Sequence, residues 1–219
     1  DLVRGRASEE DIHQVAALYL GEVAYTDHFV GRLLRRLEKD GLLQHAVVVI
    51  TADHGEMLSE EPKLAYSHGS SVDEGVMHIP LIVWGRGVPL AQHRRVASHV
   101  GMAQLGPSIE KLMGLKPTLG ERQDFWNLLR PGPVLDRDDW PEHGASTITM
   151  EATRPPRREY KDGWNNLKFS RGVRVGKWVL RQPLGSSAQH WSGLEGVQAK
   201  ASREALMQIL RQALQSWDQ

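Results

Sequence analysis

Residues 47 to 56 read VVVITADHGE, and this stretch decides the fold. The unbroken run of apolar and β-branched residues predicts a strand buried on both faces, as in a parallel sheet. The chain then turns through Asp53, His54, Gly55 and Glu56. Ligands of open α/β sheets collect outside the carboxyl ends of the strands, so these polar side chains stand where a site is expected.

The segments around this strand alternate between helix and strand. Ser8 is a predicted N-cap for a long helix from Glu9 to Lys39, and Gly41 ends it. A second apolar run covers residues 79 to 84, and another helix is predicted over residues 102 to 113. This order is typical of an α/β layer. Apolar residues of the long helix recur at three- and four-residue steps or their multiples, on one stripe: Ile12, Ala16, Tyr19, Val23, Val30, Leu34 and Leu37.

The pattern of the sequence changes after about residue 131. Residues 131 to 144 are turn-rich, and residues 146 to 151 alternate like an exposed strand. Residues 168 to 181 read as a hairpin, and residues 203 to 217 as an amphipathic helix. We therefore predict two domains, an α/β part over 1–132 and a small subdomain over 133–219, formed by an antiparallel sheet and a closing helix.

Composition excludes several classes of protein and site. The 219 residues carry 27 basic and 27 acidic side chains, which gives no indication of a nucleic-acid or membrane-surface partner. Cysteine is absent, so the chain has no disulfide, thiolate ligand or cysteine nucleophile. No apolar run is long enough to span a bilayer. The chain opens on DLVRGRASEEDI without methionine, so we expect a fragment; cytoplasmic and periplasmic or extracellular locations both stay open.

Asp53 and His54 offer an anionic oxygen and an imidazole nitrogen side by side, which together suit a divalent cation such as Ca²⁺, Mn²⁺ or Zn²⁺. The alternative is a polar turn in which Asp53 caps the following segment. His68 lies fourteen residues after His54 and before the second strand, where it could face the same crevice. There it could neutralise an anionic oxygen or protonate a leaving group; a solvated loop histidine is the alternative.

Taken together, TADHGEMLSEE and SHGSSVDEGVMHIPLIV resemble the sulfatase family of the alkaline phosphatase superfamily. The resemblance extends to YLGEVAYTDHFVGRLLRRLEKDGLLQHAVVVITADHGE before them and to SHVGMAQLGPSIEKLMGLKP after them, and it weakens beyond residue 117. It implies a partial alkaline-phosphatase-like α/β fold, in which a parallel-sheet sandwich is followed by a small antiparallel sheet and a helix. It also implies a hydrolase of sulfuric or phosphoric esters.

The resemblance gives roles to individual residues. Asp53 and His54 match two metal ligands of the family, whose typical metal is calcium; Mn²⁺ and Zn²⁺ are alternatives. His68 matches a Lys or His that contacts the sulfate or phosphate group. Glu56 is expected to start a helix or to support the ligands rather than to bind the metal.

Three departures from the family pattern matter. The family's Gly-Glu-His is Ser59-Glu60-Glu61 here, and Val72 occupies the position of an aromatic residue. The family places further metal-binding acids and the nucleophile, often within C/S-x-P-x-R, on earlier strands, and no fitting motif precedes Asp53. Residues 153 to 157 (TRPPR) mimic that motif on the wrong side of the metal residues, which indicates a chance match. We therefore expect the nucleophile-bearing N-terminal half to be a missing partner, and the isolated chain to be inactive.

Three functions stay open at this point. The first is a metal-dependent hydrolase of small-molecule or glycan sulfate or phosphate esters. The second is a phosphoryl or phosphoethanolamine transferase of the same superfamily. The third is a non-catalytic half-fold that binds a partner. The first two require side-chain heavy atoms of His68 within roughly 10 Å of Asp53 or His54. A partial fold should also leave the long helix and the sheet edge uncovered.

Overall fold

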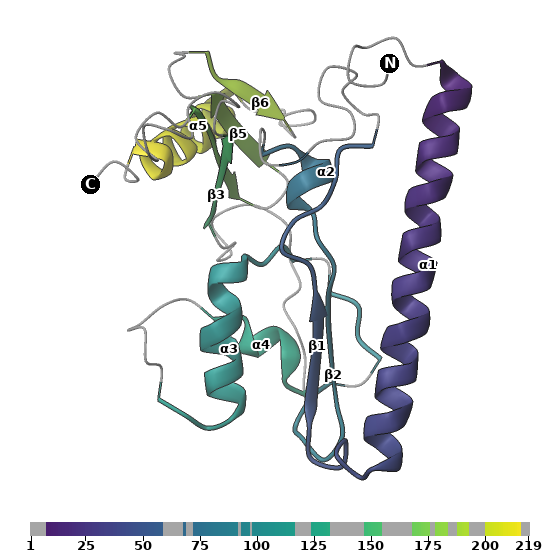
Figure 1. Cartoon of the computed structure of the whole chain (residues 1–219). Coiled ribbons are helices and arrows are strands. Elements are labelled where there is room, and N and C mark those ends of the chain that lie inside the picture. The colour runs from purple at the N-terminus through teal and green to yellow at the C-terminus, as the bar shows by residue number, and fades with distance from the viewer. Residues whose placement is uncertain are drawn as a thin grey trace, which may run out of the picture. The chain divides into compact units, whose positions relative to one another are not determined.

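A computed structural model describes residues 8–58, 68, 72–91, 93–96, 98–116, 124–131, 147–154, 168–175, 178–183, 188–192 and 200–215 (Figure 1). The chain divides into two compact units, residues 1–90 and residues 91–219. Within the described residues, we find no helix with both the length and the apolar character that crossing a membrane requires.

The first unit begins with α1, Glu9–Lys39, which runs unbroken in Figure 1. Its first turn is held by a capping box, because the Ser8 hydroxyl accepts from the Asp11 backbone N–H and the Asp11 carboxylate accepts from the Ser8 backbone N–H. Asp40 is the C-cap, and Gly41 follows with φ of +75°, a conformation that favours glycine. The bounds predicted from the sequence are confirmed.

No residue of α1 is buried. The predicted stripe is half-buried at Ile12, Ala16, Val30, Leu34 and Leu37, whereas Tyr19 and Val23 are exposed. A further set of large apolar side chains on α1 is exposed as well: Leu18, Leu20, Tyr25, Phe29 and Leu33. The expectation of an uncovered long helix is confirmed, since α1 exposes more apolar surface than a solvated helix normally carries.

Two strands of the first unit form its sheet. β1, Val47–Thr51, pairs with β2, Leu81–Gly85, in the register Val47 to Gly85 and Thr51 to Leu81. This pairing is antiparallel, so the parallel arrangement predicted for these two strands is wrong. A run of apolar residues does not encode strand direction. A parallel pair needs a long crossover, usually helical, and the only helix described between these strands is the four-residue α2, Glu74–Met77.

The β1–β2 sheet is only partly covered. All five residues of β1 are half-buried, and Ile82 and Trp84 of β2 are 54% and 39% exposed. Burial on both faces, predicted from the apolar run, is therefore incomplete within the described residues. An ion pair of 3.0 Å between the Arg86 guanidinium and the Glu38 carboxylate links the end of α1 to the residue after β2.

The second unit opens with three short helices: η2 (Met102–Gln104), α3 (Leu105–Leu112) and α4 (Trp126–Leu129). η2 and α3 together account for the helix predicted over 102–113, whereas α4 was not predicted. The buried Ser108 hydroxyl joins α3 to α4, because it donates to the Gln104 carbonyl at 2.7 Å and accepts from the Phe125 N–H at 2.9 Å.

The second sheet has four antiparallel strands in the order β3, β4, β5, β6. Their bounds are Thr147–Arg154, Lys168–Val175, Trp178–Pro183 and His190–Ser192. The predicted hairpin is confirmed as β4 and β5, and the predicted strand over 146–151 as β3. β6 was not predicted.

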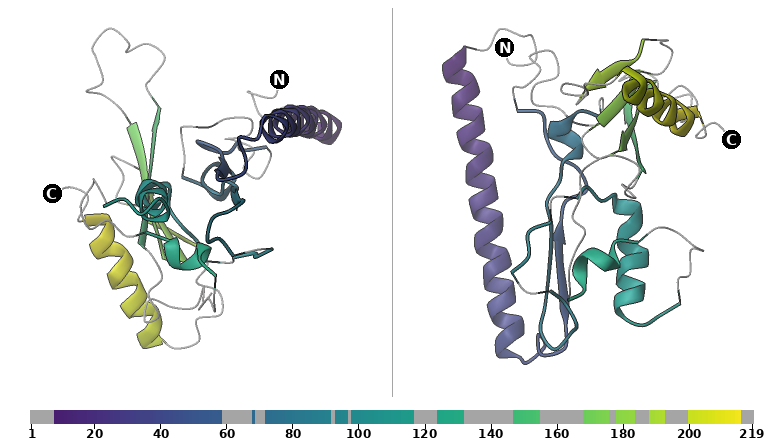
Figure 2. Two further views of the ribbon diagram at one scale, coloured as in Figure 1. Left: turned by 90° about the horizontal axis from the view of Figure 1, so that it is seen from below. Right: turned by 180° about the vertical axis from the view of Figure 1, so that it is seen from behind.

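This second sheet carries its own core. Val173 pairs with Leu180 and Val175 with Trp178, and all four side chains are at most 4% exposed. The closing helix α5, Lys200–Gln215, lies along the sheet (Figure 2) and contributes the fully buried Leu210. The predicted antiparallel sheet with a closing helix is thus present. The compact units divide the chain at a different point from the predicted domains, 1–132 and 133–219, and that division stays a prediction.

Candidate functional site

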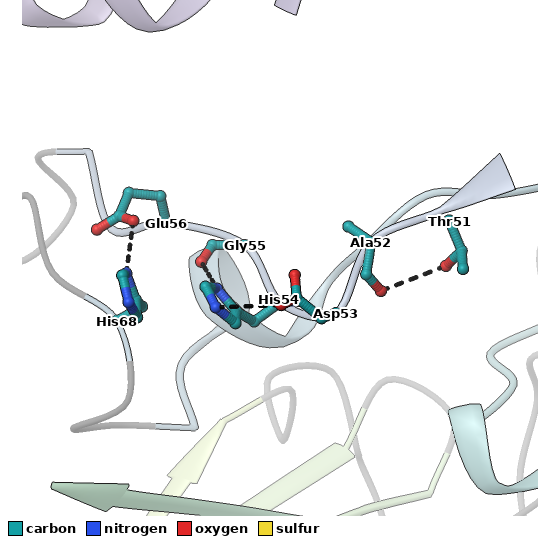
Figure 3. A network of polar contacts seen from close by, with 7 residues as sticks. All are labelled: Thr51, Ala52, Asp53, His54, Gly55, Glu56 and His68. Atoms are coloured by element: carbon teal, nitrogen blue, oxygen red, sulfur yellow. Dashed lines mark hydrogen bonds and ion pairs between the residues drawn. The ribbon is translucent and has the colours of Figure 1, made fainter. Parts of the chain in front are cut away.

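The sequence places Asp53 and His54 directly after β1, at its carboxyl end, as predicted (Figure 3). The Asp53 side chain is 88% exposed and that of His54 is 42% exposed, so both are open to a ligand. Residues 54–58 are not helical, so within the described residues the alternative role of Asp53, as a cap for the following segment, is not observed. Its Oδ1 instead accepts from the backbone N–H of His54 at 2.9 Å.

Gly55 anchors this turn to α2. Its N–H donates to the Val76 carbonyl at 2.7 Å, and a side chain at position 55 would collide with the Gly75 carbonyl oxygen. Only glycine permits so close an approach of two backbones. Near this contact in the sequence, Met57, Val72 and Val76 are each at most 3% exposed. The turn is therefore fixed to α2 by its backbone and is flanked by buried apolar side chains, including Val72 at the position where the family pattern has an aromatic residue.

The His54 ring is oriented by its own backbone. Its Nδ1 lies 2.9 Å from the Gly55 carbonyl oxygen, which can only accept, so Nδ1 carries the proton of that bond. Nε2 of the neutral ring then keeps its lone pair, and it lies 3.6 Å from Asp53 Oδ2. Two donors bound to one divalent ion at about 2.1–2.4 Å stand roughly 3.0–3.9 Å apart. The pair therefore fits part of a metal site.

Local hydrogen bonds keep Asp53 anionic. The backbone N–H of His54, the N–H of Asp53 itself and the neighbouring His54 ring lower the pKa of the Asp53 carboxyl from its usual value of 3.8. A hydrogen bond or positive charge that favours the ionised form has this effect. Because the carboxylate is charged at neutral pH, it supplies the negative oxygen that a cation requires.

His68 lies beside His54. The two ring centroids are 4.3 Å apart with the planes inclined by 24°, so the rings stack. The distance expected from the sequence, within roughly 10 Å, is confirmed. The roles of Asp53, His54 and His68 as metal ligands and substrate contact stay predictions. In the described part of the chain, no group of three or more His, Asp or Glu side chains is arranged to hold a metal ion.

Sequence reasoning missed one contact of this site. His68 Nδ1 lies 2.8 Å from Glu56 Oε2, and the Glu56 side chain is the less exposed of the two, at 26% against 53%. Glu56 does not begin a helix, which corrects one of its two expected roles. The two residues are twelve apart in a stretch of sequence without helical or strand periodicity, so no pattern in the sequence could indicate that they meet.

Comparisons with known proteins show which family this chain is similar to. A family model described as Sulfatase matches residues 3–115. Arylsulfatase K of Bos taurus is 30% identical over 174 residues, which are 73% of this chain and 31% of that protein. Arylsulfatase K of Danio rerio is 31% identical over 116 residues, which are 53% of this chain and 21% of that protein. The chain spans about a third or less of the length of the curated relatives it matches.

Solved structures share the fold. The phosphonate monoester hydrolase SpPMH from Silicibacter pomeroyi has a TM-score of 0.70 at 20% identity, over 95% of this chain and 42% of that one. BT1596, a 2-O GAG sulfatase, has a TM-score of 0.69 at 15% identity, over 97% of this chain and 44% of that one. BT4656, solved with its substrate D-glucosamine-2-N,6-O-disulfate, has a TM-score of 0.64 at 16% identity, over 91% of this chain and 40% of that one. At these identities the likeness concerns the fold.

Proposed function

Because this chain belongs to the sulfatase family of the alkaline phosphatase superfamily, we propose that it forms part of a metal-dependent hydrolase of sulfuric esters. The observation that carries the proposal is the convergence of Asp53 Oδ2 and His54 Nε2 at 3.6 Å, with the His68 ring stacked beside them. Anionic oxygen, imidazole nitrogen and a second imidazole are the groups that metal-assisted ester hydrolysis uses.

In this proposal Asp53 and His54 hold a divalent metal ion. When bound, such an ion polarises the ester and stabilises the charge that develops on its oxygens. Calcium is the first candidate from the family resemblance, and the imidazole nitrogen of His54 is also compatible with Mn²⁺ or Zn²⁺. Because an ion of this kind needs about four to eight donors, two from this turn form only part of its shell.

His68 is proposed to contact the anionic group of the ester. With Nδ1 turned to Glu56, its Nε2 is the nitrogen left for the ester oxygens or for a leaving group that takes up a proton. The substrate class is supported by relatives: the matched solved proteins include a 2-O GAG sulfatase and a complex with a disulfated glucosamine. A sulfated glycan or a small sulfate ester is therefore the proposed substrate. The phosphonate monoester hydrolase fold keeps phosphoric esters as the second candidate.

The nucleophile and the remaining metal donors are proposed to come from polypeptide outside residues 1–219. Two observations support this. The matched solved chains are more than twice as long as the part that this chain covers, and α1 and β2 carry exposed apolar side chains. A further layer of the same fold would cover that surface. We accordingly expect residues 1–219 alone to be inactive.

The test is turnover of p-nitrophenyl sulfate and p-nitrophenyl phosphate by the longer protein that contains this chain, before and after chelation and return of metal. Asp53→Ala should abolish turnover, because it removes the anionic ligand of the ion that organises the site. His68→Ala should cost less, about 10²–10⁴-fold in kcat. Asp40→Ala, an exposed aspartate at the end of α1, is the matched control and should leave turnover unchanged.

Two outcomes would contradict the proposal. Full activity of the Asp53→Ala protein would remove Asp53 from the metal site. Metal-dependent turnover by residues 1–219 alone would show that the nucleophile lies within this chain, and would direct attention to Thr153 in β3 and the residues that follow it.

A further inference from the structure

We infer that Glu56 is a positioning residue that fixes the orientation and tautomer of His68. The inference rests on the proposed function, because it concerns the side chain that would contact the ester. It begins from a short contact between two side chains that the chain separates by twelve residues: Glu56 Oε2 lies 2.8 Å from His68 Nδ1 (Figure 3).

The backbone fixes Glu56 on both sides. Gly55 before it is hydrogen-bonded to Val76 and packed against the Gly75 carbonyl, and Met57 after it is only 2% exposed. The carboxylate therefore leaves the chain from a defined point. Its partner His68 is more exposed, so the carboxylate is the more constrained member of the pair. Glu56 therefore positions His68, and not the reverse.

The hydrogen bond also decides which nitrogen of His68 faces the ligand. An ionised carboxylate only accepts, so the Nδ1 beside it must carry a hydrogen. Nε2 is then the atom that remains for the substrate. The His54 ring stacks on the face of the same imidazole at 4.3 Å, which limits rotation out of the plane. The hydrogen bond to Glu56 fixes the rotation of the His68 ring within its plane, and stacking on His54 fixes the orientation of that plane.

This arrangement resembles the way in which carboxylates orient histidines in metal and acid–base sites, where loss of the orienting partner costs about 10–100-fold in activity or affinity. Glu56 does not touch the reacting atoms in this scheme. It acts through His68, and that dependence can be measured directly.

The first experiment reads the tautomer and needs no turnover. The longer protein that contains this chain is labelled with ¹⁵N-histidine and studied by NMR at alkaline pH, and His68→Gln assigns the signals. Wild type should show His68 protonated at Nδ1. Glu56→Ala should move the proton toward Nε2, whereas Glu56→Gln should keep it on Nδ1, because its amide oxygen still accepts. An unchanged Nδ1–H signal in Glu56→Ala would overturn the inference.

The chain provides a matched control. Glu74 Oε1 and His78 Nδ1 form a similar pair at 3.2 Å, on α2 and the residue that follows it. Glu74→Gln removes one carboxylate of the same kind beside a different histidine. It should leave the His68 signals unchanged, and a shift of His68 in this variant would contradict a specific role for Glu56.

The second experiment is a double-mutant cycle in the longer protein. Glu56→Ala should lower kcat about 10–100-fold, and Glu56→Gln should restore most of that loss. If Glu56 acts through His68, Glu56→Ala combined with His68→Ala should be no slower than His68→Ala alone. Multiplicative losses would show that Glu56 acts independently. Because the NMR result does not depend on activity, failure of the ester-hydrolase proposal and failure of this inference remain distinguishable.

Discussion

The two sheets of this protein differ in how far the described chain covers them. In the second unit, β4 and β5 bury Val173, Val175, Trp178 and Leu180 almost completely. In the first unit every residue of β1 is half-buried, and Ile82 of β2 is 54% exposed. The lowest exposed fractions among the apolar side chains described in the first unit belong instead to Met57, shortly after β1, and to Val72 and Val76, before and within α2. In the first unit, burial is therefore highest near the candidate site and lower in the sheet.

Replacing one apolar side chain by alanine in each sheet should give the largest difference in stability between the two sheets. Leu180→Ala should cost about 2–5 kcal/mol in the free energy of unfolding, because it leaves a cavity in a closed core. Ile82→Ala should cost about 1 kcal/mol or less, since much of this side chain already faces solvent. The free energy of unfolding of each unit is measured by urea unfolding, which is followed through amide hydrogen exchange in β5 for the second unit and in β2 for the first. Similar losses in the free energy of unfolding at the two positions would contradict the difference in burial between the two sheets.

A substitution in the turn tests whether packing there holds the first unit. Gly55→Ala should cost about 1–3 kcal/mol or more, because its Cβ would meet the Gly75 carbonyl oxygen. Gly21→Ala in α1, where nothing lies within 4 Å, is the control and should stabilise by about 0.5–1 kcal/mol. The midpoint of urea unfolding is the measurement. A Gly55→Ala protein as stable as wild type would show that the two backbones can separate freely.

The smallest expected effect is at the start of α1, where a local cap operates without a surrounding core. Ser8→Ala should cost about 1 kcal/mol, because the Asp11 backbone N–H loses its acceptor. Ser8→Asn should preserve the cap. Amide exchange in the first turn of α1 measures the change, and equal protection in Ser8→Ala and wild type would contradict the cap's contribution.

The same cap predicts a pH dependence. Hydrogen bonds from the Ser8 hydroxyl and the Ser8 backbone N–H lower the pKa of the Asp11 carboxyl below its usual value of 3.8. Because the pKa of Asp11 is lower in the folded state, its carboxylate stabilises the folded state at pH values above the usual pKa. This contribution is lost as the pH falls through the lowered pKa. First-turn protection in wild type should therefore decrease on acidification below pH 3.8. Ser8→Ala should show a weaker dependence.

Features with local signals could be predicted from the sequence. The bounds of α1 follow from Ser8, the apolar period and Gly41. The hairpin of β4 and β5 follows from the apolar and β-branched runs on either side of Gly-Lys in the sequence. The position of Asp53 and His54 after β1 follows from the apolar run that ends before them, and the proximity of His68 from its place before the next strand.

Features that depend on contacts between distant segments could not be predicted. The direction of the β1–β2 pair is set by the path of the intervening chain, which apolar content does not encode. The short helices α2 and α4, of four residues each, are below the length at which a helical period can be recognised. Glu56 meets His68 across twelve residues, and the backbone of the adjacent Gly55 closely approaches that of Gly75; no sequence pattern reports either contact.

The backbone contact between Gly55 and Gly75 has a consequence for which positions of this region can vary. It joins the turn that carries Asp53 and His54 to α2, so the turn and the helix form one block. A side chain at position 55 would push the two backbones apart. For protein engineering, Gly55 is therefore a position to leave unchanged, whereas Gly21 of α1, with nothing within 4 Å, has room for a side chain.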